Sequence, residues 1–290
     1  GWYKNQTITI SGASRDYHMY LPANVTNAPI VILLHGNRSS NDELIGFTNA
    51  KAPYKAWEDI ALQENLMLLV PNGTDGSSGR RGWNDCRNDA DGNPDADDVL
   101  FINNLIDFVV NEHQADGSKV FAVGTSNGGH MAMRLAQEIP EKLTAFAAIV
   151  ASNPVNSQCT NAILPISALF MNGTEDPINP YEGGEISSNR GDVFSAEDTI
   201  NYWVNRNQTN TTPTVTDLAD LDPDDSCTVK KHVYANGTNN TEVVFYEVIG
   251  GGHTEPSISE RYSNLFKLVV KAQNGDIEMA NEVWDFFRTK

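Results

Sequence analysis

The stretch Gly124-Thr125-Ser126-Asn127-Gly128 decides the fold of this chain, because the residues on either side of it predict a strand and a helix. The apolar run 120–123 predicts a buried strand, and residues 129–136 predict the helix. A serine on such a turn projects its hydroxyl above the sheet, and the two glycines allow the backbone to approach closely. The pattern therefore predicts a nucleophile elbow at Ser126. The alternative is a glycine-rich turn with a solvent-exposed serine.

A candidate acid follows a later apolar run. Residues 164–172 predict a strand that leads into Gly173-Thr174-Glu175-Asp176-Pro177. A carboxylate just beyond the C-terminal end of a strand can reach an imidazole on a neighbouring loop. We predict Asp176 rather than Glu175 for this role, since Pro177 fixes the backbone behind it. The alternative is that Asp176 only caps a turn.

A candidate base follows one more predicted strand, at 242–249. This strand leads into Gly250-Gly251-Gly252-His253-Thr254, in which three glycines form a flexible mount for a loop imidazole. Of the six histidines, His253 alone has this setting, and we expect His130 to point into helix packing. The order serine, acid, histidine along the chain is the order that nucleophile-elbow enzymes use.

An early apolar run provides the expected oxyanion hole. Residues 30–34 predict a buried strand that ends at His35-Gly36-Asn37-Arg38-Ser39. Beside a nucleophile elbow, one oxyanion amide follows the nucleophile and the other lies in the loop after such a strand. We therefore predict the amides of Asn127 and of Asn37 or Gly36 as donors, and we expect His35 to hold the loop in place.

The composition limits the class of protein. The chain has 290 residues and a formal net charge of −18. We expect one catalytic domain over residues 1–290, since α/β sheets of this size usually fold as a unit. The acidic charge argues against nucleic acid and anionic membranes as partners, because both attract basic patches. No apolar run in the sequence is long enough to cross a membrane.

Cysteine usage and the first residue bear on location. Cys86, Cys159 and Cys227 predict one disulfide and one free thiol in an exported protein, and the sequence leaves the pairing open. The chain starts at Gly1 rather than at methionine, as expected if a leader has been removed or the chain shortened. We therefore predict a secreted or periplasmic protein.

Strands and helices are expected to alternate after an opening hairpin, in which residues 7–11 pair with 17–21 through a connection at 12–16. Further strands are expected at 66–71, 145–151 and 228–234, and helices at 54–63, 97–114, 196–205 and 278–287. This order predicts an α/β fold with a mostly parallel central sheet and helices on both faces. Ligands bind beyond the C-terminal ends of parallel strands, where Ser126 is expected.

Two loops have both functional and structural interpretations. Residues 89–98 are rich in aspartate and are a candidate calcium site, although they lack the spacing and final glutamate of an EF-hand. An acidic loop that leads into a helix N-terminus explains them equally well. Trp83, after Arg80-Arg81-Gly82, is either a substrate-pocket wall or a core or surface side chain.

Taken together, these motifs resemble the polyhydroxybutyrate depolymerase-like, feruloyl-esterase-like branch of the α/β-hydrolases. The motifs are HGN (35–37), GWND (82–85), ADDVLFINNLID (96–107), GTSNGGHMA (124–132), NGTEDPINPYEGG (172–184) and GGGHTEP (250–256), in family order. The resemblance implies a secreted serine esterase of the α/β-hydrolase fold. It also implies Ser126 as nucleophile, Asp176 as orienting acid and His253 as general base, in chemistry that requires no cofactor or metal.

The chain departs from the family pattern next to the predicted base. Relatives often have tryptophan after the His-Thr pair, whereas this chain has Glu255, which we expect to place a carboxylate beside the substrate pocket. The leading prediction is a small-molecule or oligomeric substrate, a feruloyl, hydroxycinnamoyl or similar aromatic ester. Polyhydroxyalkanoate oligomers and acetylxylan are alternatives. A catalytically silent binding protein is the non-enzyme alternative, and it is disfavoured because all three candidate residues are present.

Overall fold

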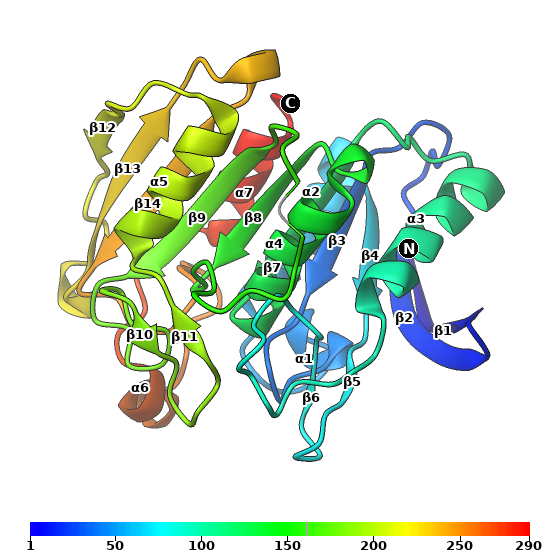
Figure 1. Cartoon of the computed structure of the whole chain (residues 1–290), viewed down its shortest axis with the longest axis horizontal. Coiled ribbons are helices and arrows are strands. Elements are labelled where there is room, and N and C mark those ends of the chain that lie inside the picture. The colour runs from blue at the N-terminus through cyan, green and yellow to red at the C-terminus, as the bar shows by residue number, and fades with distance from the viewer. Residues whose placement is uncertain (161) are drawn as a thin grey trace.

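A ten-stranded sheet forms the frame of the molecule (Figure 1). The computed structural model describes residues 1–160 and 162–290. In spatial order the strands are β1 (Trp2–Ile10), β2 (Ala13–Tyr20), β4 (Met67–Pro71), β3 (Ile30–Leu34), β7 (Val120–Thr125), β8 (Ala145–Ile149), β9 (Ser167–Gly173), β14 (Val243–Ile249), β13 (Thr228–Tyr234) and β12 (Thr214–Asp217). Neighbours from β4 to β14 are parallel, whereas those at both edges are antiparallel. The predicted mostly parallel sheet is confirmed.

Helices cover both faces of the sheet, as predicted. One face carries α3 (Asp98–His113), α4 (Asn127–Glu138) and α5 (Ala196–Asn207), and the other carries α2 (Ala56–Glu64) and α7 (Met279–Phe287). Strand β3 contributes to both cores: Ile30, Ile32 and Leu34 face the first, and Val31 and Leu33 face the second. Burial on both faces explains why this strand is a continuous apolar run rather than an alternating one.

Several short elements lie outside the sheet. They are α1 (Asn41–Leu44), α6 (Asn264–Val270), the hairpin of β5 (Thr74–Asp75) and β6 (Arg81–Gly82), the hairpin of β10 (Gly184–Glu185) and β11 (Asp192–Val193), and 3-10 turns at Pro53–Lys55, Pro140–Lys142, Pro223–Asp225 and Thr238–Asn240. Among the described residues, no helix is both long enough and apolar enough to span a bilayer.

The opening hairpin differs from its prediction. The connection is only Ser11-Gly12, both with positive φ (49° and 82°), instead of residues 12–16. Such a two-residue turn matches the twist of paired strands, so residues 13–16 join β2. Edge strand β12 and helix α6 were not predicted. All four residues of β12 are exposed, and α6 buries only Val270, so neither sequence carries a periodic apolar pattern.

The cysteine pairing that the sequence left open is Cys86–Cys159, and Cys227 is the buried free thiol. The bond joins the loop after β6 to the loop between β8 and β9. Disulfides persist in oxidising compartments, which is consistent with an exported protein.

Candidate active site

Loops at one edge of the sheet bring three of the predicted residues together. Ser126 follows β7, Asp176 lies just beyond β9 and His253 just beyond β14. His253 Nε2 lies 2.9 Å from Ser126 Oγ, and His253 Nδ1 lies 2.8 Å from Asp176 Oδ2. Parallel strands end at the same edge, which is why residues far apart in sequence meet here. The three side chains form one hydrogen-bonded chain.

The turn at Ser126 has the geometry of a nucleophile elbow. Ser126 has φ 54° and ψ −120°, between the last residue of β7 and the first of α4. A Cβ on Gly124 would overlap the Gly128 carbonyl, and a Cβ on Gly128 would overlap the Leu34 carbonyl. Only glycine fits at either position. The crowded backbone holds the serine in a conformation that a free chain rarely adopts.

The Asp176 carboxylate performs two tasks with its two oxygens. Oδ1 accepts hydrogen bonds from the amides of Ile178 (2.8 Å) and Asn179 (2.9 Å), and Oδ2 faces His253. Its side chain is 1% exposed. Asp176 therefore caps a turn, as the alternative interpretation stated, and its carboxylate also contacts His253. Glu175 instead meets Lys271 at the surface, 3.5 Å away.

The three glycines before His253 are not the flexible mount that we predicted. Gly251 N–H donates to Val248 O (3.1 Å), and Gly252 N–H donates to Ala272 O (2.9 Å). A Cβ on Gly252 would overlap the Val270 carbonyl. The amide of His253 itself donates to Val270 O at 2.7 Å. The glycines serve close backbone packing, so the imidazole is held in a fixed position.

His35 fixes the loop after β3, as expected. Its Nδ1–H donates to Gly36 O (2.8 Å), and its Nε2 accepts from the Gly73 amide (2.9 Å). Burial lowers the pKa of His35 to about 4, so the ring is neutral at physiological pH, which this pair of contacts requires. Trp83 Nε1 donates to His35 O at 2.8 Å and secures the same loop.

Two of the predicted oxyanion amides are available next to the serine. Among the described residues, the backbone amides of Asn37 and Asn127 have no hydrogen-bond acceptor. A Cβ on Gly36 would lie 3.6 Å from Ser126 Cβ, which shows how closely this loop approaches the elbow. Asn127 is also the first residue of α4, where the helix dipole favours negative charge.

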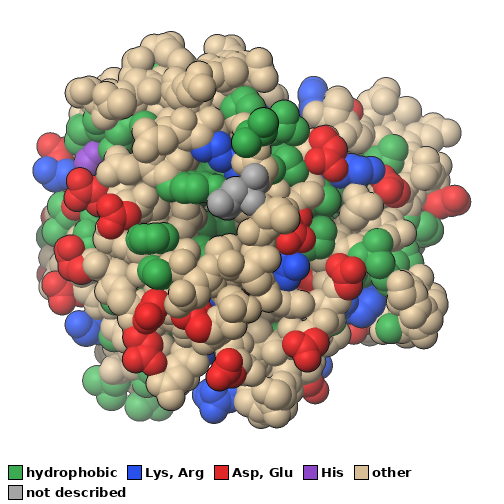
Figure 2. Space-filling model, viewed as in Figure 1, with side chains coloured by type: hydrophobic (Ala, Val, Ile, Leu, Met, Phe, Trp, Pro, Cys, Tyr) green, Lys and Arg blue, Asp and Glu red, His purple; other side chains and the backbone are tan. Residues whose placement is uncertain are grey.

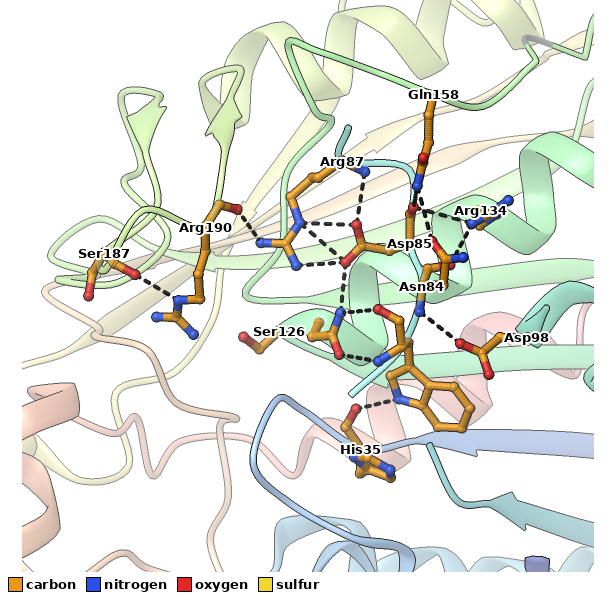
Figure 3. Close-up of polar contacts among 12 residues, drawn as sticks. His35, Asn84, Asp85, Arg87, Asp98, Ser126, Arg134, Gln158, Ser187 and Arg190 are labelled. Carbon is orange, nitrogen blue, oxygen red and sulfur yellow. Dashed lines mark hydrogen bonds and ion pairs between the residues drawn. The ribbon is translucent and has the colours of Figure 1, made fainter. Parts of the chain in front are cut away.

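A buried ion pair orients Asn127, and the sequence analysis missed it. Asn127 Nδ2 donates to Asp85 Oδ2 (2.7 Å), and Asn127 Oδ1 accepts from the Trp83 amide (2.7 Å). Arg87 Nη2 lies 2.6 Å from Asp85 Oδ2, and both side chains are almost fully buried (Figure 3). Burial raises the pKa of Asp85, but Arg87 outweighs it and the net shift is downward. The only sequence signal was the GWND motif itself.

Two predicted substrate-pocket residues are elsewhere. Trp83 is fully buried in the core under α3 and α4, so the core alternative is correct and the pocket-wall interpretation is wrong. Glu255 is 7% exposed and accepts a hydrogen bond from Tyr262 Oη at 2.6 Å. It is a buried partner of that tyrosine rather than a free carboxylate beside the pocket. The local sequence around Trp83 and Glu255 does not reveal what packs against either side chain.

Three aspartates of the candidate calcium loop face separate partners. Asp97 caps α3 through the Leu100 amide, Asp98 pairs with Arg15 at 2.6 Å, and Asp89 accepts from Asn156 at 2.6 Å. Within residues 1–160 and 162–290, no three acidic, histidine or cysteine side chains are placed to share a metal ion. The contacts favour the interpretation as an acidic loop that leads into a helix.

Comparison with known proteins establishes the family. Residues 9–241 match a family model whose description is "Putative esterase". The chain belongs to this esterase family. It is a carboxylic ester hydrolase, as predicted.

The esterase is similar to two curated fungal proteins. It is 29% identical over 206 residues to the bifunctional acetylxylan esterase/xylanase XynS20E of Neocallimastix patriciarum, covering 69% of this chain and 28% of that protein. It is 29% identical over 192 residues to "Probable feruloyl esterase C" of Aspergillus niger, covering 63% and 64%. The chain therefore spans less than two thirds of either relative.

One solved structure supports the fold. The acetyl xylan esterase from Aspergillus awamori superposes with a TM-score of 0.58 at 15% identity, covering 92% of this chain and 98% of that chain. The predicted α/β-hydrolase fold of the esterase is thus confirmed by a neighbour that aligns along almost its entire length.

Removal of the Asp85 carboxylate should destabilise the esterase. Asp85→Ala leaves the buried Arg87 guanidinium without its carboxylate, which typically costs about 3–5 kcal/mol. Urea denaturation of wild type and variant measures the loss. Asp285→Ala is the control, because its pair with Arg288 is about half exposed and should contribute little. Equal urea midpoints for Asp85→Ala and Asp285→Ala would contradict the buried-pair assignment.

Acid should destabilise the esterase through two buried histidines. Burial lowers the pKa of His35 to about 4, and burial and then Arg87 lower that of His130 to about 3. Below about pH 6.5, these two histidines bind protons in the unfolded chain but not in the native state. The free energy of unfolding should therefore fall towards pH 4, by up to about 1.4 kcal/mol per pH unit for each histidine. His130→Gln should reduce this slope in urea titrations between pH 7.5 and 4.5, and an unchanged slope would refute the assignment.

Proposed function

We propose that the esterase cleaves feruloyl, hydroxycinnamoyl or similar aromatic esters by acyl transfer through Ser126. The observation that carries this proposal is the hydrogen-bonded chain from Ser126 through His253 to Asp176, beside two unoccupied backbone amides. Such a chain at an elbow suits nucleophilic attack on a carbonyl. The aromatic acyl group is supported by similarity to the Aspergillus niger relative named as a feruloyl esterase.

In the first step, His253 Nε2 removes the proton from Ser126 Oγ as this oxygen attacks the ester carbonyl. Asp176 accepts from Nδ1–H, which fixes the tautomer that leaves Nε2 free as the base and stabilises the imidazolium that forms. The amides of Asn37 and Asn127 donate to the developing oxyanion, each contributing about 3–4 kcal/mol.

Collapse of the tetrahedral intermediate expels the alcohol, which takes its proton from His253. The acyl group then remains on Ser126 Oγ as an ester. A water molecule attacks this acyl-enzyme with His253 again as base, and the released acid restores the free serine. Every proton in this cycle passes through one ring nitrogen, so the fixed His253 loop keeps the base in place.

Two other classes of ester substrate are alternatives. Acetylxylan is favoured by similarity to the Neocallimastix patriciarum protein, and polyhydroxyalkanoate oligomers by the motif resemblance alone. We further propose that residues 1–290 act as a single catalytic domain. Secretion or periplasmic location is also proposed, and the Cys86–Cys159 disulfide supports it.

Ester preference distinguishes these classes. Purified enzyme is offered methyl ferulate, acetylated xylan and a 3-hydroxybutyrate trimer, and kcat/KM is measured for each. The proposal expects ferulate release to be fastest by at least about tenfold, a difference of about 1.4 kcal/mol in transition-state binding. If acetate or hydroxybutyrate release is faster, the aromatic-ester assignment is wrong, although acyl transfer through Ser126 stands.

A further inference from the structure

Four arginines near Ser126 have no acidic partner. Arg38, Arg80, Arg81 and Arg190 form no ion pair with any described residue. The chain carries 38 Asp and Glu against 20 Lys and Arg, so acidic partners are plentiful. Figure 2 shows acidic side chains spread over the face that carries α3, α4 and α5, with fewer basic ones. All other arginines have a carboxylate within 4.0 Å, except Arg206, which bonds neutral oxygens.

Three of these arginines flank the oxyanion loop. Arg38 follows Asn37, and its amide donates to Arg81 O at 2.8 Å. The hairpin of β5 and β6 therefore lies against this loop. Arg38, Arg80 and Arg81 line an open hollow at this point together with two acidic residues, Glu43 and Asp75. Arg38 is exposed and the other two arginines are half-buried.

Arg190 lies in the hairpin of β10 and β11, next to Arg87. Its carbonyl accepts from Arg87 Nη1 (2.8 Å), and its Nε donates to Ser187 O (2.7 Å). The amide of Ser187 donates to Ile178 O at 3.1 Å, within the turn that holds Asp176. The backbone around Arg190 is thus anchored on both sides. Its two terminal nitrogens form no hydrogen bond or ion pair with any described residue, and Figure 3 draws none for them.

This arrangement concentrates like charge. Burial lowers the pKa of Arg190, and Arg87, Arg38 and Arg80 lower it further, while Asp176 alone raises it. Like charges therefore act on the Arg190 guanidinium. Asp176 cannot compensate for them, because its two oxygens are already engaged by His253 and two amides. The two carboxylates of the hollow, Glu43 and Asp75, form no ion pair with these arginines, so the guanidinium groups remain available to an anion from solution.

We infer that Arg38, Arg80, Arg81 and Arg190, the arginine cluster, bind a carboxylate of the substrate. The esterase then prefers esters that carry a second, ionised carboxyl group over their neutral counterparts. Guanidinium groups match carboxylates with two parallel hydrogen bonds, which gives both affinity and orientation. The inference rests on the proposed function, because the ester carbonyl must still reach Ser126.

Matched pairs of esters test the inference. The first pair is 4-carboxybenzyl ferulate and 4-carbamoylbenzyl ferulate, which differ in charge on the alcohol side. The second is methyl 4-carboxycinnamate and methyl 4-carbamoylcinnamate, which differ on the acyl side. Wild-type kcat/KM should favour the carboxylate in at least one pair by about tenfold at low salt. In 0.5 M NaCl the preference should shrink, since salt screens exposed charges.

Variants assign the preference to the cluster. Arg190→Gln and Arg38→Gln should each lower the carboxylate-to-amide ratio of kcat/KM about tenfold, and Arg190→Lys should lower it less because the charge remains. Arg288→Gln is the matched control, since its pair with Asp285 lies at the surface. The control should keep the wild-type ratio.

The outcomes separate this inference from the proposed function. If wild type hydrolyses both members of each pair equally and Ser126→Ala hydrolyses neither, acyl transfer stands and the inference is wrong. If wild type turns over none of these esters, the aromatic-ester proposal is wrong, and calorimetric titration of Ser126→Ala with the same compounds decides the inference. Tighter binding of the carboxylates supports it, and equal or no binding overturns it.

Discussion

Replacing Ser126 by alanine should lower kcat by about 10⁴- to 10⁶-fold and leave the fold intact. The hydroxyl is the only oxygen that His253 Nε2 contacts among the described residues, at 2.9 Å. Without it, no acyl-enzyme forms, and only direct attack by water assisted by the oxyanion amides remains. The effect should appear in kcat rather than in KM, because the alanine removes a group that acts in the transition state.

The measurement is ferulate release from methyl ferulate by wild type and variant, together with thermal unfolding of both. Ser14→Ala is the matched control, since Ser14 is exposed on β2 and far along the sheet from the elbow. The melting temperature of Ser126→Ala should equal or exceed that of wild type, because residue 126 has a strained φ of 54° in either case. Retention of a tenth of the wild-type kcat would exclude Ser126 as the nucleophile.

The sequence was sufficient to find the three residues of the hydrogen-bonded chain, because the residues around each of them form a recognisable pattern. Ser126, Asp176 and His253 each follow an apolar run that the structure shows as β7, β9 and β14. Parallel strands place their C-terminal ends at one edge, so the topology brings these residues together without further information.

The sequence was insufficient where a role depends on what packs against a residue. The sequence fits Trp83 equally well as a pocket wall or as a core side chain, and only its complete burial in the core decides between them. From the sequence alone, Glu255 is expected to be a free carboxylate, whereas in the structure it accepts a hydrogen bond from Tyr262 Oη. The three glycines before His253 suggest flexibility, yet a Cβ on Gly252 would overlap the Val270 carbonyl, and Cβ atoms on Gly250 and Gly251 would overlap other neighbours. In each case the deciding atoms are distant in sequence or belong to a segment whose fold was not predicted.

The same reasoning explains why the Asp85–Arg87 pair was missed. Charged residues two positions apart in a polar loop usually lie in solvent, and here they are almost fully buried instead. Asp85 joins the loop after β6 to α4 through Asn127, and the disulfide at Cys86 ties this loop to the segment after β8. The loop around Asp85 is therefore held by contacts between residues far apart in sequence, which local sequence patterns do not reveal.

Gly128→Ala should have the largest effect on stability. A Cβ at this position would overlap the carbonyl oxygens of Leu34 and His35, at the end of β3. Neither partner can move away easily: Leu34 pairs with Gly124 in the sheet, and His35 is held by three hydrogen bonds. Overpacking of backbone against backbone belongs to the class of changes that cost more than about 4 kcal/mol.

We therefore expect Gly128→Ala to lose soluble expression or to unfold at a much lower urea concentration than wild type. Gly92→Ala is the matched control, because the nearest atom to its added Cβ would be Ser78 Oγ at 3.6 Å, an ordinary contact. A wild-type unfolding midpoint for Gly128→Ala would show that α4 can shift away from β3. Such a shift would also move the Asn127 amide away from Ser126, so the position of the elbow and the stability of the core depend on the same glycine.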